Sequence, residues 1–343
     1  MNVRFRNAVA IVAACLLGPA GGATEAAATR FEYSAPRMGT LFRVVLYAPA
    51  EPAARAAAAA ALARVAELNR ILSDYDPESE VSRLSHCAPG TAVPVSAELF
   101  ALLEESQRLA AESEGAFDVT VGPIVRLWRH ARRTHQLPPP AERATALRAA
   151  GHAKLRLRAD DRTVTLLAAG MALDFGGIAK GYAADAALAV LRQHGFSRAM
   201  VAAGGDLALG APPPGAAGWR IELAPFGGSL GEPLVLVAAD VAVSTSGDAE
   251  QFIEFDGVHY SHIVDPRTAL GLTHPCAVTI IARRGAQADG LATAGCVLAA
   301  GQPETFAAWL GDRARAIIFR RDAAGRIERT TCGTNPPGLH SSL

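Results

Sequence analysis

Apolar side chains recur along this chain at helix and strand spacings, and the pattern predicts most of its elements. Val65, Leu68 and Leu72 follow one another at intervals of three and four residues, which is the spacing of one face of a helix. We therefore expect a helix over 52–72.

Capping residues, turn residues and strand alternation give the other elements. Ser96, a residue type that caps helices, predicts a second helix that ends near Gly115. Further helices are expected over 176–194 and 286–300, and two helical pieces should be separated at 138–140. Strands are expected at 41–47, 163–167, 171–175, 199–203, 219–223, 234–237 and 278–282, with a final hairpin over 316–320 and 326–330. This alternation predicts an α/β (α+β) domain with mixed sheets and flanking helices, including a βαβ-like unit over 171–203.

The sharpest local prediction is a β-hairpin around Asp256-Gly257. This dipeptide is a strong signal for a two-residue turn between strands over 252–255 and 258–263. Counting outward from the turn pairs Phe255 with Val258. The next pair joins Glu254 to His259.

The first 23 residues have the pattern of an export signal. Arg4 and Arg6 precede an apolar run over 8–17, which is too short to span a membrane. Small residues at 21–23 offer a cleavage site, and a lipoprotein signal that ends before Cys15 is the alternative. Either signal places the folded part of the chain outside the cytoplasm.

Composition and net charge argue against two classes of protein. The chain has 343 residues, half of them apolar, with 33 basic and 33 acidic side chains. The apolar content argues against a disordered chain, and the balanced charge argues against a nucleic-acid-binding protein, which needs a basic surplus. Lys154 and Lys180 are the two lysines among the basic residues. Because arginine and lysine are not interchangeable, each lysine is a candidate for a specific role.

Asp289 and Thr293 form the first candidate site. They lie four residues apart, so the helix expected over 286–300 presents both on one face. A carboxylate and a hydroxyl are oxygen ligands that suit Mg²⁺ better than zinc. A helix cap or a solvated face explains the same pair of residues.

The second candidate is the glycine-containing segment Asp174-Phe175-Gly176-Gly177-Ile178-Ala179-Lys180-Gly181. Glycines let a ligand approach the backbone, and a helix N-terminus favours an anion. Lys180 adds a positive charge, and Asp174 can accept a hydrogen bond from a ligand. The spacing matches neither a Walker A loop nor a dinucleotide fingerprint. A close helix–sheet turn with a surface lysine is the alternative.

His262 lies near the end of the predicted hairpin, before a polar turn. Histidine titrates near neutral pH, which suits a general base. Asp265 could orient it, and Arg267 could bind a phosphate through two hydrogen bonds. A half-buried strand histidine beside an Asp-Pro turn explains the same pattern.

Hydroxyl and aromatic side chains complete the candidates. Ser246 and its neighbours in Ser244-Thr245-Ser246-Gly247-Asp248 could donate hydrogen bonds to a phosphate, although such turns are common without a function. Tyr75 and Phe117 could stack on a flat ring. A turn tyrosine and a core phenylalanine are the ordinary interpretations.

Taken in order, eight segments resemble the ApbE-type flavin transferases, the FAD:protein FMN transferase family. They are 36–40, 72–76, 115–123, 174–181, 204–206, 244–248, 262–268 and 288–293. Each segment is weak alone, but their shared order makes coincidence improbable. The resemblance extends over nearly all of the chain that follows the signal.

This resemblance implies one compact domain that binds FAD and Mg²⁺ and transfers FMN to a threonine or serine hydroxyl of a partner protein, releasing AMP. The partners of the family are membrane-linked redox subunits, which suits export to the periplasmic side of the inner membrane in a soluble or lipid-anchored, peripherally associated form. The expected boundaries are a linker over 24–36, the domain over 37–331 and a C-terminal tail over 332–343.

By motif position, the resemblance also implies roles for individual residues. The flavin-nucleotide contacts are expected to be Met38, Tyr75, Ala116, Phe117, Asp118, Asp174 and Lys180, to which Ser246 and Arg267 are added as the phosphate contacts suggested above. The Mg²⁺ ligands are expected to be Gly177 through its carbonyl, Asp289 and Thr293. His262 is expected to be the catalytic base.

Two positions depart from the family pattern. The glycine expected after Thr268 comes only at Gly271, and Ala249 stands where an aromatic side chain is common.

Three other functions stay open. The same site could use water and split FAD into FMN and AMP. A non-catalytic flavin-binding protein and a Mg²⁺-dependent phosphatase acting on other nucleotides are the remaining alternatives.

Overall fold

The computed structural model describes residues 28–224, 226, 234–247, 252–300, 303–322 and 325–341. Its helices are α1 (Glu51–Leu72), α2 (Glu80–Ser85), α3 (Ala97–Glu112), α4 (Gly122–Thr134), α5 (Pro140–Ala149), α6 (Ala179–Gln193), α7 (Gly285–Ala299) and α8 (Pro303–Leu310), with a 3₁₀ turn η1 (His152–Lys154). The expected export signal, Cys15, Asp248 and Ala249 lie outside these residues.

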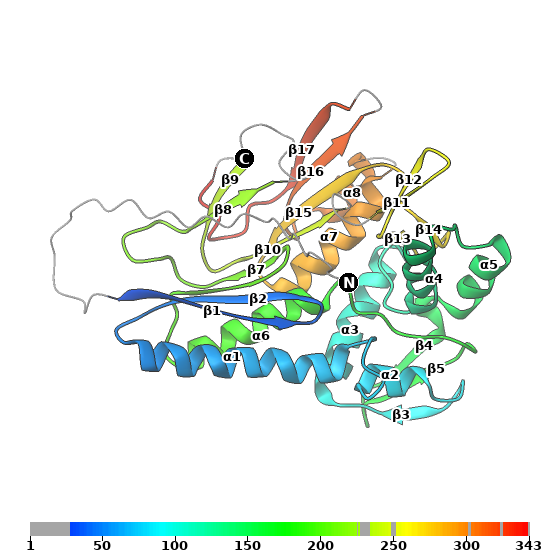
Figure 1. Ribbon diagram of the computed structural model, residues 1–343, viewed down its shortest axis with the longest axis horizontal. Coiled ribbons are helices and arrows are strands. Elements are labelled where there is room, and N and C mark those ends of the chain that lie inside the picture. Colours follow the sequence, from blue (N-terminus) through cyan, green and yellow to red (C-terminus); the bar gives the residue numbers. More distant parts are fainter. Residues whose placement is uncertain are drawn as a thin grey trace.

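The strands form one large sheet and several small ones (Figure 1). The large sheet has the order β1 (Thr29–Arg37), β2 (Thr40–Ala48), β6 (Ala199–Ala203), β7 (Asp206–Leu209), β10 (Ala242–Gly247), β15 (Cys276–Ala282), β16 (Arg315–Arg321) and β17 (Ile327–Gly333). The small sheets are β3 (Ala92–Pro94), β5 (Thr163–Leu166) and β4 (Leu155–Arg158); β8 (Trp219–Leu223) and β9 (Leu234–Ala238); β11 (Phe252–Phe255) and β12 (Val258–Ser261); and β13 (Val264–Asp265) and β14 (Leu270–Gly271).

The large sheet separates two apolar cores, because successive side chains of a strand point to opposite faces. In β15, Val278 and Ile280 face the core that lies under the helices, whereas Ala277 and Ile281 face the core under the β8–β9 ribbon. Helices α1, α6 and α7 cover the first face (Figure 1). All seven residues of β15 are buried, as expected for a central strand covered on both faces.

Several sequence predictions are confirmed. The α/β (α+β) class is correct, α1 matches the expected helix, and the Ser96 hydroxyl caps α3 by accepting a hydrogen bond from the Leu99 N–H. The β11–β12 hairpin has the expected register, with Phe255 opposite Val258 and Glu254 opposite His259. Among the described helices, none combines the length and apolar character that crossing a bilayer requires.

The expected βαβ-like unit is wrong, and so is the expectation of mixed sheets. All the pairings of the named strands are antiparallel. Residues 171–175 form no strand and make one isolated parallel bridge, between Ala172 and Val121. Their neighbour 119–121 leads directly into α4, so the pairing cannot continue beyond that bridge.

The expected linker and tail boundaries are also corrected. Residues 29–37 form the edge strand β1, whose Phe31 and Tyr33 pack against the core. Pro36 is tolerated there because an edge strand does not require every backbone N–H. The tail expected over 332–343 belongs to the fold as far as Ser341, since β17 ends at Gly333 and the Gly338 carbonyl accepts a hydrogen bond from Ala239.

Helices α6 and α7 cross with direct backbone contact at Gly181 and Gly285. A Cβ added at Gly181 would lie 2.1 Å from the Gly285 carbonyl oxygen, and one added at Gly285 would lie 2.2 Å from the Gly181 carbonyl oxygen. Each helix then caps the other. The Asp289 carboxylate accepts from the Gly181 N–H at 3.0 Å, and the Asp185 carboxylate accepts from the Gly285 N–H at 2.6 Å.

We predict that Gly285→Ala destabilises the protein. Replacing glycine by alanine inside an unobstructed helix stabilises it by up to about 1 kcal/mol. Here the new methyl group meets a backbone carbonyl, which cannot move aside as a flexible side chain can. We expect a loss of about 2–4 kcal/mol in the free energy of unfolding, measured by urea denaturation. A variant as stable as the wild type would contradict this close crossing.

Candidate active site

The segment 174–180, which leads into α6, lies at the centre of the candidate site. Its Gly177 carbonyl faces Thr293 of α7, and the two oxygens are 3.4 Å apart. The Ser246 hydroxyl lies 3.3 Å from the Thr293 hydroxyl. A Cβ at Gly177 would come within 2.9 Å of Thr293. The glycine therefore allows the approach of two groups that the sequence analysis expects to share a metal ion.

Asp289 lies one helical turn before Thr293 and is 1% exposed. Burial and the nearby Asp206 carboxylate raise the pKa of Asp289 to about 7, although the Lys180 ammonium, at 3.6 Å, opposes this shift. A cation bound beside Asp289 would favour its ionised form.

Lys180 is held between two buried carboxylates. Its ammonium donates to Asp206 at 2.8 Å and faces Asp289. Burial disfavours the charged lysine, but the two carboxylates outweigh burial and raise the pKa of Lys180. The ammonium is therefore charged at neutral pH.

Asp206 is the residue of this cluster to which the sequence analysis gave no role. It is 3% exposed, and Ser244, directly opposite it across β7 and β10, donates to its second oxygen at 2.5 Å. The available signal was an aspartate directly after Gly204-Gly205 in one of the matching segments. The pairing of β7 with β10 connects residues far apart in the sequence, so spacing alone could not show it.

The turn that contains Met38 lies next to the β6–β7 turn, which leads to Asp206. Met38 adopts a positive φ of 50° at the β1–β2 turn. A Cβ at Gly204 would lie 3.1 Å from the Thr40 hydroxyl, so the β1–β2 and β6–β7 turns are neighbours. The structure thus brings the Met38 turn toward the end of the sheet that carries Asp206.

The donor set of this cluster fits Mg²⁺. Gly177, Thr293 and Asp289 offer a carbonyl, a hydroxyl and a carboxylate, all of them oxygen ligands. Mg²⁺ characteristically uses one or two protein carboxylates and keeps water or phosphate in its other positions. Within the described part of the chain, no group of three His, Cys, Asp or Glu side chains could hold a metal. A zinc-type ligand set is therefore not found there.

A second cluster lies at the start of segment 174–180, around Asp174. The Arg129 guanidinium pairs with Asp174 at 2.7 Å and also with Asp74, and it lies over the ring of Tyr75. The second oxygen of Asp174 accepts from the Gly176 N–H at 2.7 Å. Arg129 and Asp74 were not among the predicted site residues, because nothing in the local sequence links α4 to the turn after α1.

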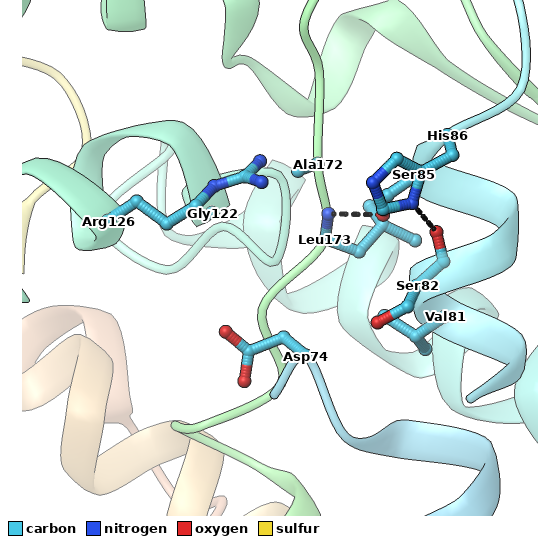
Figure 2. A pocket seen from close by; sticks show the side chains of 9 residues that line it. All are labelled: Asp74, Val81, Ser82, Ser85, His86, Gly122, Arg126, Ala172 and Leu173. Atoms are coloured by element: carbon cyan, nitrogen blue, oxygen red, sulfur yellow. Dashed lines mark hydrogen bonds between the residues drawn. The ribbon is translucent and has the colours of Figure 1, made fainter. Parts of the chain in front are cut away.

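A small pocket adjoins this cluster (Figure 2). It is lined by Asp74, Val81, Ser82, Ser85, His86, Gly122, Arg126, Ala172 and Leu173. In Figure 2 the Arg126 and Asp74 side chains project toward its interior, and Ser85 binds the Leu173 N–H. Its volume of about 40 Å³ suits water molecules rather than a nucleotide.

The predicted contacts at 116–118 lie beside Asp174 but have buried side chains. The Asp174 N–H donates to the Val119 carbonyl at 2.8 Å. Asp118 accepts from the Thr120 N–H at 2.8 Å, the Thr120 hydroxyl at 2.7 Å and the His152 N–H at 2.7 Å, and burial raises its pKa. Ala116 and Phe117 are also buried. These side chains support the fold, so a ligand would meet mainly the backbone of this segment.

The loop after β12 holds the remaining candidates. Asp265, considered as an orienting group for His262, accepts two hydrogen bonds of 2.9 Å each from the Arg267 guanidinium. Arg267 lies in the same tight turn, which explains this choice of partner. A Cβ at Gly115 would lie 3.9 Å from the Arg267 side chain, so this arginine flanks segment 115–119.

His262 lies in the bend between β12 and β13 and is half-buried. The loop is anchored on α4, where the Trp128 indole N–H donates to the Ala269 carbonyl at 3.0 Å. The late glycine, Gly271, is required because a Cβ there would lie 2.5 Å from the Ser261 carbonyl oxygen. The departure from the family pattern therefore has a packing reason in this chain.

Comparisons with known proteins show the family of this chain. The model of the ApbE family matches residues 38–318. The FAD:protein FMN transferase of Treponema pallidum is 35% identical over 315 residues, covering 86% of this chain and 86% of that protein. The FAD:protein FMN transferase of Vibrio cholerae is 30% identical over 272 residues, covering 78% and 81%.

Solved structures that share this fold are also flavin transferases. The apo crystal structure of Pseudomonas stutzeri flavinyl transferase ApbE has a TM-score of 0.77 and 29% identity, covering 89% of this chain and 95% of that chain. The flavin transferase ApbE from Vibrio cholerae has a TM-score of 0.80 and 27% identity, covering 91% and 100%. The fold and site thus define a flavin-transferase-type enzyme. The chain belongs to the ApbE family, which confirms the resemblance and the predicted class of transferase.

We predict that Asp289→Asn removes Mg²⁺ binding. The substitution replaces the carboxylate, which is the one charged group among the three oxygen groups of the cluster, by a neutral amide. Mg²⁺ should raise the thermal unfolding temperature of the wild type but not that of the variant. Asp240→Asn, which changes an exposed turn carboxylate, is the matched control and should keep the shift. An equal Mg²⁺ shift in Asp289→Asn would show that the ion binds elsewhere.

Proposed function

We propose that this chain is a Mg²⁺-dependent FAD:protein FMN transferase, which attaches FMN from FAD to a threonine or serine hydroxyl of a partner protein and releases AMP. The observation that carries the proposal is the oxygen cluster of Gly177, Asp289 and Thr293 beside the Lys180 ammonium at the start of α6. The names of the relatives support the flavin substrate and the protein acceptor.

The first task of the site is to hold a pyrophosphate. Gly177, Asp289 and Thr293 would hold Mg²⁺, which when bound supplies charge neutralisation for the phosphates. Lys180 and the N-terminus of α6 add positive potential on the protein side. Because Asp206 and Asp289 hold the ammonium in place, its position is set before a substrate arrives. Such preorganisation is the main contribution a protein makes to phosphoryl-type transfer.

The second task is proton transfer from the acceptor. A protonated hydroxyl is a poor nucleophile, so His262 would take its proton as the hydroxyl oxygen attacks the FMN-side phosphorus. A bond forms between that oxygen and phosphorus, and the bond from phosphorus to the bridging oxygen breaks. The electron pair leaves with AMP, and the proton stays on His262.

The proposed location follows from the N-terminal sequence. Export would place the enzyme on the periplasmic side of the inner membrane, either soluble or held there peripherally by a lipid at Cys15. Membrane-linked redox subunits with a Thr/Ser flavinylation motif would be its acceptors. The balanced charge of the chain gives no reason to propose a nucleic-acid partner.

We predict covalent flavin on an acceptor that carries a Ser/Thr-Gly-Ala-Ser/Thr-type motif. Incubation of the chain with FAD, Mg²⁺ and such an acceptor should raise the acceptor mass by that of FMN less one water and release one AMP per acceptor. Free FMN without a modified acceptor would identify a hydrolase. FAD binding without AMP release would identify a flavin-binding protein, and absence of FAD binding would favour a phosphatase acting on other nucleotides.

We predict that His262→Ala slows transfer by about 10²–10⁴-fold, the range that a general base contributes, while FAD affinity stays close to that of the wild type. His259→Ala is the matched control, since His259 packs against the Phe252 ring on the same hairpin. The rate of acceptor labelling and the dissociation constant for FAD are measured for both. Labelling by His262→Ala at the wild-type rate would refute the assignment of the base.

A further inference from the structure

Arg129 joins three segments that are distant in the sequence. It projects from α4, and its side chain is 18% exposed. One arm of the guanidinium pairs with Asp74, in the turn after α1, and the other pairs with Asp174 at 2.7 Å. Two carboxylates on one planar guanidinium fix its orientation as well as its position.

The face of this guanidinium lies against Tyr75. The guanidinium carbon is 4.2 Å from the ring centroid, which is within the range of a cation–π contact. Tyr75 is nevertheless 74% exposed, so the contact leaves much of its aromatic surface accessible. A large aromatic side chain that is both fixed and exposed is a characteristic of binding surfaces.

The backbone beneath Tyr75 is also fixed. The Ser73 hydroxyl accepts from the N–H groups of Tyr75 and Asp76, both at 3.3 Å, and the Ser73 carbonyl accepts from the Ser79 hydroxyl. The Asp76 carboxylate accepts from the Glu78 N–H at 3.0 Å. The turn therefore limits the backbone, and Arg129 limits the side chain.

We propose that Arg129 is a positioning residue that holds Tyr75 as a stacking platform for a flat ring of the dinucleotide substrate. This inference rests on the proposed function, because it takes FAD as the ligand. A side chain ordered before binding loses less conformational entropy when the ligand arrives, so the platform increases affinity for the ring. Arg129 acts through Tyr75 and touches no reacting atom.

A purely structural salt bridge would have different consequences. It would join α4 to the two aspartates and affect stability. The effect of losing it on FAD affinity would be the same with and without the Tyr75 ring. The proposal instead requires coupling between Arg129 and Tyr75. A double-mutant cycle measures this coupling directly.

The test compares Arg129→Lys, Tyr75→Ala and the double variant. Lysine keeps a positive charge beside the carboxylates but lacks the planar fork that binds both of them and stacks on the ring. We expect Arg129→Lys to weaken FAD binding by about tenfold in the wild-type background and by less than about twofold in the Tyr75→Ala background. Fluorescence titration of FAD with Mg²⁺ present gives the dissociation constants.

Two further measurements keep the outcome unambiguous. Thermal unfolding without ligand confirms that each variant is folded, and Arg133→Lys, an exposed arginine on the same helix, is the matched control with unchanged affinity. In acceptor labelling, Arg129→Lys should raise KM for FAD while kcat changes by less than about threefold. Titrations with FMN, which carries the flavin ring, and with ADP, which carries the adenine ring, identify which ring stacks on Tyr75. The ligand whose ring does so should lose affinity in Arg129→Lys as FAD does.

The inference is overturned if Arg129→Lys binds FAD as the wild type does, or if its loss of affinity is the same with and without the Tyr75 ring. It is also overturned if neither FMN nor ADP shows the loss. Failure of the wild type to bind FAD would instead refute the proposed function, so the two failures are distinguishable.

Discussion

The direct backbone contact between Gly181 and Gly285 is the constraint on which the geometry of the site depends. Because neither residue has a Cβ, the backbones of α6 and α7 meet directly. At this distance Asp289 of α7 reaches the first turn of α6, where the peptide N–H groups lack partners within their own helix. The carboxylate therefore lies beside Lys180. One turn further along α7, Thr293 reaches the Gly177 carbonyl, so a single helix crossing sets the relative positions of the oxygen ligands.

The charges around Lys180 explain why this arrangement suits an additional cation. Two nearly inaccessible carboxylates, Asp206 and Asp289, face one ammonium, so the cluster carries more negative than positive charge when both are ionised. Burial makes that state unfavourable, which is why the pKa of Asp289 is raised. A divalent cation coordinated by Asp289 would offset the excess charge. Asp206, supported by Ser244, holds the Lys180 ammonium beside Asp289.

The sequence predicted the parts that depend on local spacing and missed the parts that depend on distant pairing. The register of the β11–β12 hairpin follows from Asp256-Gly257, and α1 follows from its apolar stripe. Segment 29–37 is an exception: Phe31, Tyr33 and Ala35 alternate with polar residues, which is a strand pattern, yet the expected linker covered it. The motif order located Gly177 and Thr293, which the structure brings together. Asp206 and Arg129 acquire their partners through the tertiary fold. The Gly204-Gly205-Asp206 segment marked Asp206 for attention, but spacing could not show its partners.

Helix α4 connects the two chemical ends of the proposed site. Trp128 anchors the loop that carries His262 by donating to Ala269, whereas its neighbour Arg129 holds Asp74 and Asp174. Successive residues of a helix point about 100° apart, so two adjacent side chains can serve two different surfaces. The loop that carries His262 and the contact between Arg129 and Tyr75 therefore share one rigid support. A shift of α4 would move both together, so under the proposed function one helix would set the distance between the proposed base and a ring stacked on Tyr75.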